Sequence, residues 1–323
     1  MSGTLAVVDV TGVGLNATDT MIRVPHFPAF NSKVEILSSH VSAGGQVASA
    51  LVACAKWGLS ARYVGKIGDD AAGEFQRQEM ARAGIEAHFA VAKNCQSQSA
   101  YILVDEETGE RTVLWKRGSR LDLESADLDR EWVIRARLLH VDGHSTAAAT
   151  HAAQWAREAG IHVLADLDNL YPRAEELLVS VDYMISSREF PARLTGERDL
   201  FASLPAIARR FGCRVTAATL GSEGVLAWDR AAFFYSPAFD VRAVDTTGAG
   251  DIFHGAFAYG LLQGWVLPRI LEFGCAAAGL NCMALGARGG IEQVSRIESL
   301  IREGRRRPAA FSQATLEVAG GRP

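Results

Sequence analysis

Two patterns of apolar residues alternate along this chain. Short, almost continuous apolar runs are typical of buried strands, whereas longer segments with apolar residues at every third or fourth position are typical of helices. The predicted strands are 5–11, 62–67, 88–91, 100–104, 111–116, 138–141, 162–166, 183–186 and 215–220, followed by a hairpin-like stretch at 224–236. The predicted helices are 46–57, 71–83, 146–158, 174–179, 200–211 and 251–262. This alternation predicts an α/β protein in which helices cover both faces of a mainly parallel central sheet.

Two stretches interrupt the alternation, at about 16–38 and 97–116. Pro25 and Pro28 break the first stretch, and the dipeptide Thr108-Gly109 predicts a hairpin turn in the second. We expect both stretches to leave the main sheet and to form a small β lid over the site.

The composition supports one sizeable folded domain. The chain has 323 residues, of which 48% are hydrophobic, enough to bury a large core. We therefore predict a single α/β domain over 1–310 and a loose C-terminal tail at 311–323. The formal net charge of -4 argues against nucleic acid as the main partner, and we interpret the basic run at 302–307 as a solvated helix face. No apolar stretch is long enough to span a membrane, so we expect no membrane partner.

The cysteines and the N-terminus indicate a cytoplasmic protein. The five cysteines, an odd number without a C-x-x-C pair, are Cys54, Cys95, Cys213, Cys275 and Cys282. This pattern fits reduced thiols and argues against a zinc site. The first residues enter an apolar run directly, without a basic flank or a cleavage pattern, so no export signal is expected.

The most informative motif is the turn Gly248-Ala249-Gly250 followed by Asp251 at the start of a predicted helix. Backbone N–H groups and the positive end of the helix would meet at this turn, which predicts an anion site. A carboxylate is unfavourable beside a phosphate, so Asp251 indicates proton chemistry rather than anion capture alone. A base that takes a proton from an alcohol, next to amides that stabilise a transferring phosphoryl group, is what a small-molecule kinase needs. The alternative is a glycine-rich turn in which Asp251 only caps the helix.

A second glycine motif lies near the N-terminus. Gly12 and Gly14 follow a predicted strand and, with Glu35 as a ribose-binding acid, match a loose dinucleotide-binding fingerprint that would indicate a dehydrogenase. That fingerprint needs a helix directly after the glycines, but the prolines and β-branched residues that follow form a poor helix. The alternative is that the glycines let the chain turn away from the sheet and carry Asn16 and Asp19 toward a small polar ligand.

The string Asp-Thr-Thr-Gly-Ala-Gly-Asp at 245–251 closely resembles the C-terminal signature of the ribokinase (PfkB) family of carbohydrate kinases. The Gly-Gly motif at 44–45 and the segment 64–73 resemble the N-terminal signature, and the likeness extends over about residues 5–300. The resemblance implies a ribokinase-like three-layer sandwich with a small β lid. It also implies an ATP-dependent kinase that phosphorylates a primary hydroxyl of a sugar or sugar-like acceptor, with Mg²⁺ as cofactor.

On the acceptor side, the family holds the sugar with an Asp after the first strand and with paired glycines at a helix start. The candidates in this chain are Asn16, Asp19, Gly44, Gly45, Ser49, Tyr101 and Arg117. Ser49 and Gln46 stand where some members carry Asn, which argues against plain fructose or ribose. The segments 98–101, 109–111 and 253–255 look most like the ketohexokinase and sulfofructose kinase branches, which implies a ketose or an anionic sugar derivative.

Arg117 follows a predicted lid strand. Because a guanidinium matches two oxygens of a phosphate or sulfonate, Arg117 is a candidate for holding an anionic group on the acceptor. The alternative is an ordinary surface side chain.

On the catalytic and nucleotide side, the resemblance implies that Asp251 is the general base. The N–H groups of Ala249, Gly250 and Asp251, presented by the turn at Gly248, would hold the developing charge. The nucleotide-side candidates are Thr219, Gly221, Gly224, Ser186, Glu189 and Asn281, and the loop 286–290 would line the adenine pocket.

Metal binding is also implied by the resemblance. Ser186 replaces a family Asn, whereas Glu189 is kept and would reach Mg²⁺ through water, since magnesium retains most of its water ligands. Asp245 and Thr247 are candidates for a monovalent cation such as K⁺.

Two alternatives remain at this stage. A nucleoside or vitamin-precursor kinase of the same superfamily would share the site at Asp251 but would need an aromatic acceptor pocket. A kinase-like protein without catalysis could lose the base, which is intact here. Exposed lid strands favour pairing with a second copy, so we expect a homodimer.

Overall fold

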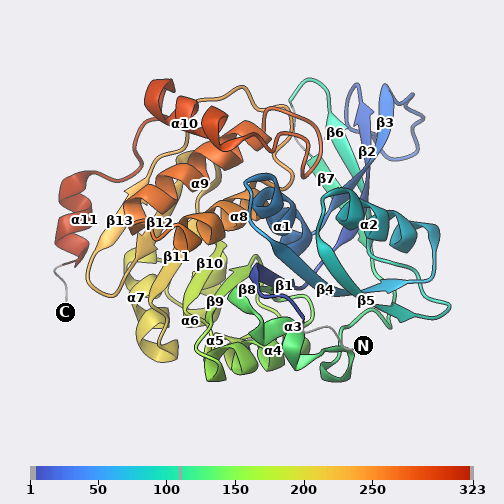
Figure 1. Ribbon diagram of the computed structural model, residues 1–323. Helices are drawn as coiled ribbons and strands as arrows, with labels where there is room; N and C mark the ends of the chain where they lie inside the picture. The colour runs from blue at the N-terminus through green and yellow to red at the C-terminus, as the bar shows by residue number, and fades with distance from the viewer. Residues whose placement is uncertain (1–4, 109–110, 321–323) are drawn as a thin grey trace.

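The computed structural model describes residues 5–108 and 111–320, and its centre is a nine-stranded sheet (Figure 1). The strand order is β13-β12-β11-β10-β9-β8-β1-β4-β5, and only β12 and β13 run antiparallel to their neighbours. The strands are β1 (Val8–Val13), β4 (Ala61–Gly68), β5 (Glu86–Ala92), β8 (Ala136–Asp142), β9 (His162–Leu167), β10 (Tyr183–Ser187), β11 (Val215–Thr219), β12 (Val225–Trp228) and β13 (Phe233–Ser236). Most are buried on both faces, which explains their nearly continuous apolar runs.

Helices cover both faces of this sheet, as Figure 1 shows. One layer contains α1 (Gln46–Lys56), α2 (Ala71–Arg82), α8 (Ala249–Leu262), α9 (Leu267–Asn281) and α10 (Val294–Glu303). The other contains α3 (Arg130–Ile134), α4 (Thr146–Glu158), α5 (Ala174–Leu178), α6 (Phe190–Thr195), α7 (Leu200–Phe211) and α11 (Gln313–Gly320). Each layer packs its own apolar core against the sheet. The predicted three-layer α/β sandwich is confirmed.

A second, four-stranded sheet stands to one side of the main sheet (Figure 1). It consists, in spatial order, of β3 (Ser38–Gly44), β2 (Ala17–Val24), β6 (Ser99–Asp105) and β7 (Arg111–Lys116). These strands come from both stretches that break the alternation, so the predicted small β sheet is present. The first stretch extends to residue 44 rather than 38, because β3 pairs with β2 along its whole length. The predicted turn at Thr108-Gly109 falls partly on Gly109, outside the described residues.

After Gly12 and Gly14 the chain enters β2 and not a helix, which excludes the dinucleotide-binding fingerprint, as the poor helix-forming residues indicated. Two other features differ from the expectations. The expected loose tail contains α11, because burial of Leu316 and Ala319 against the second core anchors it. The helices α3 and α6 are too short for a helical period to be recognised in the sequence.

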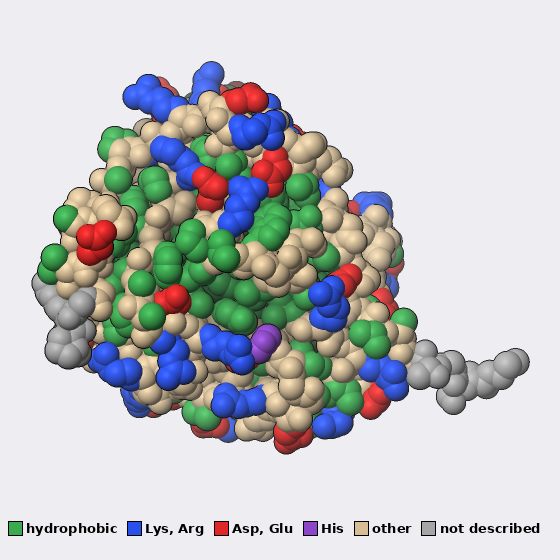
Figure 2. Space-filling model, turned by 60° about the vertical axis from the view of Figure 1, so that its left-hand side comes forward, with side chains coloured by type: hydrophobic (Ala, Val, Ile, Leu, Met, Phe, Trp, Pro, Cys, Tyr) green, Lys and Arg blue, Asp and Glu red, His purple; other side chains and the backbone are tan. Residues whose placement is uncertain are grey.

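The molecular surface and the lengths of the helices bear on the partners that were expected from the sequence. Figure 2 shows one face, on which hydrophobic side chains gather in a hollow while Lys and Arg side chains stand singly or in small groups among Asp and Glu. Within the described residues, no helix is both long and apolar enough to traverse a bilayer.

Candidate active site

The turn before α8 presents unpaired backbone donors. Gly248 has a φ of +76°, and a Cβ there would collide with the backbone of Ala287, so glycine is required. The N–H groups of Gly250 and Asp251 make no hydrogen bond to other described residues, whereas the N–H of Ala249 donates to the Thr246 carbonyl at 3.3 Å. The anion site therefore has two free donors at the positive end of α8, rather than the three expected.

Asp251 is the third residue of α8, and its carboxyl group lies within a cluster of charged side chains. Burial raises the pKa of Asp251 to about 7, while the nearby Arg288 guanidinium opposes this rise. The carboxylates of Asp168 and Asp19 raise the pKa further. A carboxyl group with a pKa near 7 is suited to take a proton from an alcohol at neutral pH.

The strand β2 and the junction between β3 and α1 bring Asp19, Gly44 and Gly45 together, and Asp19 interacts electrostatically with Asp251. Burial raises the pKa of Asp19 to about 6, again opposed by Arg288. A Cβ on Gly44 would collide with the Asp19 carboxylate. Gly45 precedes α1 with a φ of +92°, and a Cβ there would meet the backbone of Asn16. Both glycines are therefore required by close packing around Asp19.

Arg288 is the main site residue that sequence reasoning misplaced. The loop 286–290 was expected to line the adenine pocket, but Arg288 instead reaches the acceptor side. Its guanidinium donates to Ser49 Oγ at 3.1 Å, to Asn16 Oδ1 at 3.3 Å and to the Gly44 carbonyl at 2.6 Å. It ties three separate chain segments to the cluster around Asp251. A lone Arg in a glycine-rich loop carries no local signal of this role.

Two predicted acceptor residues do not face the acceptor side. Ser49 is fully buried, and its hydroxyl accepts from Arg288, so it can act on an acceptor only through that guanidinium. Tyr101 is 55% exposed and pairs with Thr20, next to Asp19 on β2. Because successive side chains of a strand point to opposite faces, Tyr101 points away from the face that carries Asp19.

The same register identifies a lid residue that was missed. Trp115 on β7 pairs with Ala100, which pairs with Asp19, so Trp115 and Asp19 share one face of the lid. Trp115 is largely exposed. The alternation along the strand 111–116 could have revealed this face, had the pairing partner been known.

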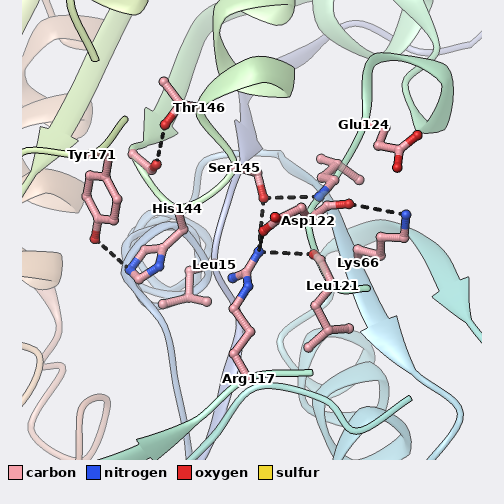
Figure 3. Close-up of polar contacts among 12 residues, drawn as sticks. Leu15, Lys66, Arg117, Leu121, Asp122, Glu124, His144, Ser145, Thr146 and Tyr171 are labelled. Atoms are coloured by element: carbon pink, nitrogen blue, oxygen red, sulfur yellow. Dashed lines mark hydrogen bonds and ion pairs between the residues drawn. The ribbon is translucent and has the colours of Figure 1, made fainter. Parts of the chain in front are cut away.

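Arg117 lies just beyond β7, where the lid joins the main domain. Its Nη2 donates to the Leu121 carbonyl at 3.0 Å, to Asp122 Oδ1 at 3.0 Å and to Ser145 Oγ at 3.2 Å. Figure 3 shows Arg117 extending toward Ser145 from one side while Lys66 approaches the backbone at Asp122 from the other. Arg117 is thus held in place at a cavity that also reaches Asn16.

A larger cavity of about 460 Å³ opens from the free N–H groups of α8. Its apolar wall consists of Phe239, Val241, Phe253, Cys275, Ala278, Gly279 and Cys282. Three residues that the sequence analysis assigned to the nucleotide side, Thr219, Gly221 and Gly224, line this cavity. Gly224 has a φ of +104°, and a Cβ there would collide with the Ser236 carbonyl. An apolar cleft that ends at an anion site has the form that a nucleotide needs.

Two other predicted nucleotide residues are buried elsewhere. Asn281 is fully buried, and its amide donates to the Thr247 and Ala287 carbonyls while its oxygen accepts from Gly290 N–H. Asn281 therefore stabilises the loop after α9 through hydrogen bonds and does not line the cavity. Ser186 lies inside the sheet, and its hydroxyl donates to the Ala217 carbonyl at 3.3 Å.

Two arginines on the nucleotide cavity were not predicted. Arg111 of β7 lines it and donates to the Thr246 hydroxyl, and Arg307 lines it from the other side. Arg307 belongs to the basic run that was interpreted as a solvated helix face. That run in fact continues past the end of α10, and its neighbour Arg306 packs over the Phe239 ring. The sequence showed the run of basic residues but not where this run lies in the fold.

The predicted metal-side residues are placed in two groups. Glu189 is exposed at the start of α6. Asp245 is buried and accepts N–H hydrogen bonds from Thr247 at 2.9 Å and from Gly286 at 2.8 Å. The Thr247 hydroxyl beside it is buried without a hydrogen-bond partner in the described part of the chain.

Two histidines support the site without facing it as free bases. His254 on α8 contacts the Gly250 carbonyl at 2.8 Å and Asp166 at 3.3 Å. Burial lowers the pKa of His254 to about 4, so it is neutral and positions the first turn of α8. His144 contacts the Tyr171 hydroxyl at 3.0 Å (Figure 3).

Known proteins share the sequence pattern and the fold of this chain. Residues 7–294 match the model of the pfkB family carbohydrate kinases. The chain is 29% identical to an ATP-dependent ribose-1-phosphate kinase of Halopiger xanaduensis, over 87% of this chain and 94% of that protein. A provisionally named ribokinase from Agrobacterium tumefaciens has a similar structure, with a TM-score of 0.84 and 28% identity over 92% of this chain and 98% of that one.

A ribokinase of Arabidopsis thaliana, solved with ribose and ATP, shares the fold. Its TM-score is 0.77 at 23% identity, over 95% of this chain and 100% of that one. The match to the family model spans most of the chain and includes both glycine motifs and Asp251. This protein therefore belongs to the PfkB family of carbohydrate kinases.

Proposed function

We propose that this protein transfers the γ-phosphoryl group of ATP to a primary hydroxyl of a sugar or sugar-like acceptor, with Asp251 as general base. The observation that carries the proposal is the position of Asp251 between two groups of residues. The nucleotide cavity reaches Ala249 and Gly250, on the turn whose Gly250 and Asp251 N–H groups are free. Asp19 and Arg288 interact electrostatically with the Asp251 carboxyl.

The reaction would proceed in one displacement. The acceptor oxygen attacks the γ-phosphorus while its proton passes to Asp251, and the bond from that phosphorus to the β,γ-bridging oxygen breaks to release ADP. The N–H groups at the start of α8 would stabilise the charge on the transferring group. Asp19 accepts hydrogen bonds from acceptor hydroxyls and so orients the acceptor for attack.

The cation requirements are also proposed. The described residues hold no group of three or more His, Cys, Asp or Glu suited to a metal ion. This fits Mg²⁺ that is held mainly by phosphates and water, with the exposed Glu189 as a partner through water. Bound magnesium would neutralise charge on the β- and γ-phosphates. The unpaired Thr247 hydroxyl beside Asp245 supports a K⁺ site, which assays with and without K⁺ would test.

For the acceptor, a ketose or an anionic sugar derivative remains our preference. The Halopiger relative is named for a phosphorylated pentose, and the Arabidopsis structure holds plain ribose. The nucleoside alternative would need an aromatic acceptor pocket, and Trp115 is the aromatic side chain that the lid places on the face of Asp19. The other acceptor-side residues described above, among them Asn16, Ser49 and Arg288, are polar or charged.

The lid supports a homodimer. Val41, Thr20, Tyr101 and Leu114 form one row across all four lid strands, on the face opposite Asp19. Three of these side chains are apolar or aromatic and about half exposed. An exposed row of this kind favours association with a second copy. The five thiols are all unpaired, which supports a reducing compartment such as the cytoplasm.

A direct test measures ADP release from ATP and Mg²⁺ with a panel of ribose, ribose 1-phosphate, fructose, a sugar acid and adenosine. We expect release with at least one sugar-type acceptor, and phosphate on its primary hydroxyl by NMR. Release with adenosine alone would favour the nucleoside alternative. The absence of release with every member, under conditions where ATP binds, would count against the proposed reaction.

A further inference from the structure

His254 connects the first turn of α8 to the main sheet behind the proposed reaction centre. The helix α8 packs against β8 and β9 (Figure 1), and the His254 side chain is only 2% exposed. Its Nδ1 lies 2.8 Å from the Gly250 carbonyl oxygen and 3.3 Å from Asp166 Oδ2. The imidazole therefore contacts a carbonyl of the first turn of α8, although it does not line the nucleotide cavity.

The surroundings of the imidazole determine which ring nitrogen carries the hydrogen. Burial lowers the pKa of His254 to about 4, so the ring is neutral at neutral pH and has a single N–H. A carbonyl oxygen can only accept, so the short contact with Gly250 places that hydrogen on Nδ1. Nε2 lies 3.4 Å from the Ile185 carbonyl, which is a longer contact. His254 is thus a hydrogen-bond donor to the Gly250 carbonyl.

The Gly250 carbonyl belongs to the same planar peptide group as the N–H of Asp251. That N–H is one of the two free donors of the anion site. A hydrogen bond accepted by the carbonyl polarises the peptide group and makes its N–H a stronger donor. The regular helical pattern gives this carbonyl the backbone N–H of residue 254 as well, and its two lone pairs accommodate both donors. The His254 side chain therefore acts on the Asp251 N–H through a single peptide group.

We propose that His254 is a positioning residue, which strengthens the Asp251 N–H as a donor to the transferring phosphoryl group and holds its peptide in one orientation. The inference rests on the proposed function. Asp166 on β9 and His140 on β8 contact the ring from the sheet, with the two imidazole centroids 5.8 Å apart. A preorganised donor acts mainly where charge develops in the transition state, so its contribution should appear in kcat rather than in substrate binding.

The test removes the N–H donor and then restores it. In His254→Leu kcat should fall about tenfold, less than the roughly 10²- to 10³-fold cost of losing a whole donor, because the Asp251 N–H is weakened but not removed. KM for ATP and for the acceptor should change less than about twofold, since ground-state binding is kept. His254→Asn, whose amide nitrogen can take the place of Nδ1, should recover most of kcat. An unchanged kcat in His254→Leu, or an equal loss in both variants, would overturn the proposal.

Thr150→Val is the matched control. The Thr150 hydroxyl donates to the Thr146 carbonyl at 2.7 Å, so it also contacts a carbonyl four residues earlier in the first turn of a helix, α4. This variant should leave kcat unchanged. A thermal melt confirms that each variant is folded, and His254→Met, which is unbranched and has no N–H donor, replaces His254→Leu if that variant does not fold.

The pH profile shows whether His254 acts on the donor or on the base. The neutral imidazole adds no charge beside Asp251, so the ascending limb of kcat/KM should keep its position in His254→Leu. A shifted limb would mean that the loss of rate comes from a changed pKa of Asp251, and it would overturn the proposal.

A binding measurement separates this inference from the proposed reaction. ADP with aluminium fluoride, a mimic of the transferring phosphoryl group, can be titrated calorimetrically with Mg²⁺ present and without turnover. Its affinity should fall about tenfold in His254→Leu and recover in His254→Asn, while the affinity for ADP alone is unchanged. Equal weakening of both ligands would overturn the inference and leave the kinase intact. The expected pattern in a wild type that releases no ADP with any acceptor would support the inference and contradict the proposed reaction.

Discussion

The two sides of the proposed reaction centre, the nucleotide cavity and the acceptor side around Asp19 and Arg288, are built in different ways. The nucleotide cavity is mainly apolar, and all its lining residues except Arg111 come from the segment 219–307. The acceptor side joins residues from distant segments, and its carboxylates and Arg288 are largely withdrawn from water. The nucleotide side therefore relies on shape and backbone, whereas the acceptor side relies on a balance of buried charges. Changes on the second side should alter acceptor choice and pH dependence.

Asp251→Asn should have the largest effect, since Asp251 stands where the two sides meet. Without a base for the hydroxyl proton, kcat should fall by about two to four orders of magnitude. The N–H groups of the turn stay in place, so ATP binding should be nearly unchanged. Initial rates and a nucleotide titration measure the two quantities. Turnover close to that of the wild type would remove Asp251 from the role of base.

A pair of glycine substitutions separates the two sides. In Gly44→Ala the new Cβ meets the Asp19 carboxylate, so KM for the acceptor should rise about tenfold or more while KM for ATP is kept. In Gly224→Ala the Cβ meets the Ser236 carbonyl at a φ of +104°, so KM for ATP should rise instead. Steady-state kinetics with each substrate varied in turn test this reciprocity. If both variants raised the same KM, the division into two sides would fail.

Arg288→Gln should change the pH dependence. In the wild type kcat/KM should increase with pH through about 7, as Asp251 loses its proton and becomes a base. The guanidinium lowers the pKa of Asp251, so its removal raises that pKa and should move the ascending limb to higher pH. Activity lost at pH 7 should be partly recovered at pH 8.5. An unshifted limb with uniformly lower rates would mean that Arg288 only positions Asn16 and Gly44.

The smallest effects should come from the lid. Trp115→Ala should raise KM for the acceptor several-fold, because Trp115 shares the face of Asp19. Tyr101→Ala should change it less than twofold, because Tyr101 lies on the opposite face. If the two variants behaved alike, the assignment of faces would be in doubt.

The outer face of the lid permits one further comparison. Leu114→Glu should weaken the proposed dimer, because it places a charge in the apolar row with Tyr101 and Val41. Light scattering after size exclusion should report a loss of mass for this variant, and Val179→Glu, at an exposed position after α5 and away from the lid, serves as a control. A wild-type protein that is monomeric at all concentrations would remove the dimer proposal.

Much of the fold was predictable because its signals are local. The sequence alone predicted the α/β alternation, the small second sheet and the turn at Gly248 before α8, and the structure agrees at each. It also predicted Asp19, Gly44 and Gly45 as one group. The preference for a ketose and the ketohexokinase likeness stay predictions.

The site residues that lie elsewhere than expected have one feature in common. Their place in a motif assigned Asn281, Ser186 and Ser49 to ligands. In the structure, the side chain of each makes hydrogen bonds within the protein. Tyr101 was assigned without knowledge of the strand register that turns it outward. In each case the sequence revealed the residue type but not the direction in which the side chain points.

The sequence by itself determined the alternation of strands and helices and the glycine turn that places Asp251 in the first turn of α8, because periodicity, glycine turns and a helix start are properties of neighbouring residues. Only the tertiary structure decided that Arg288 stands among the acceptor-side carboxylates and that it donates to Asn16 and Ser49. These arrangements depend on contacts between segments more than 200 residues apart, and burial then fixes which charges must balance one another.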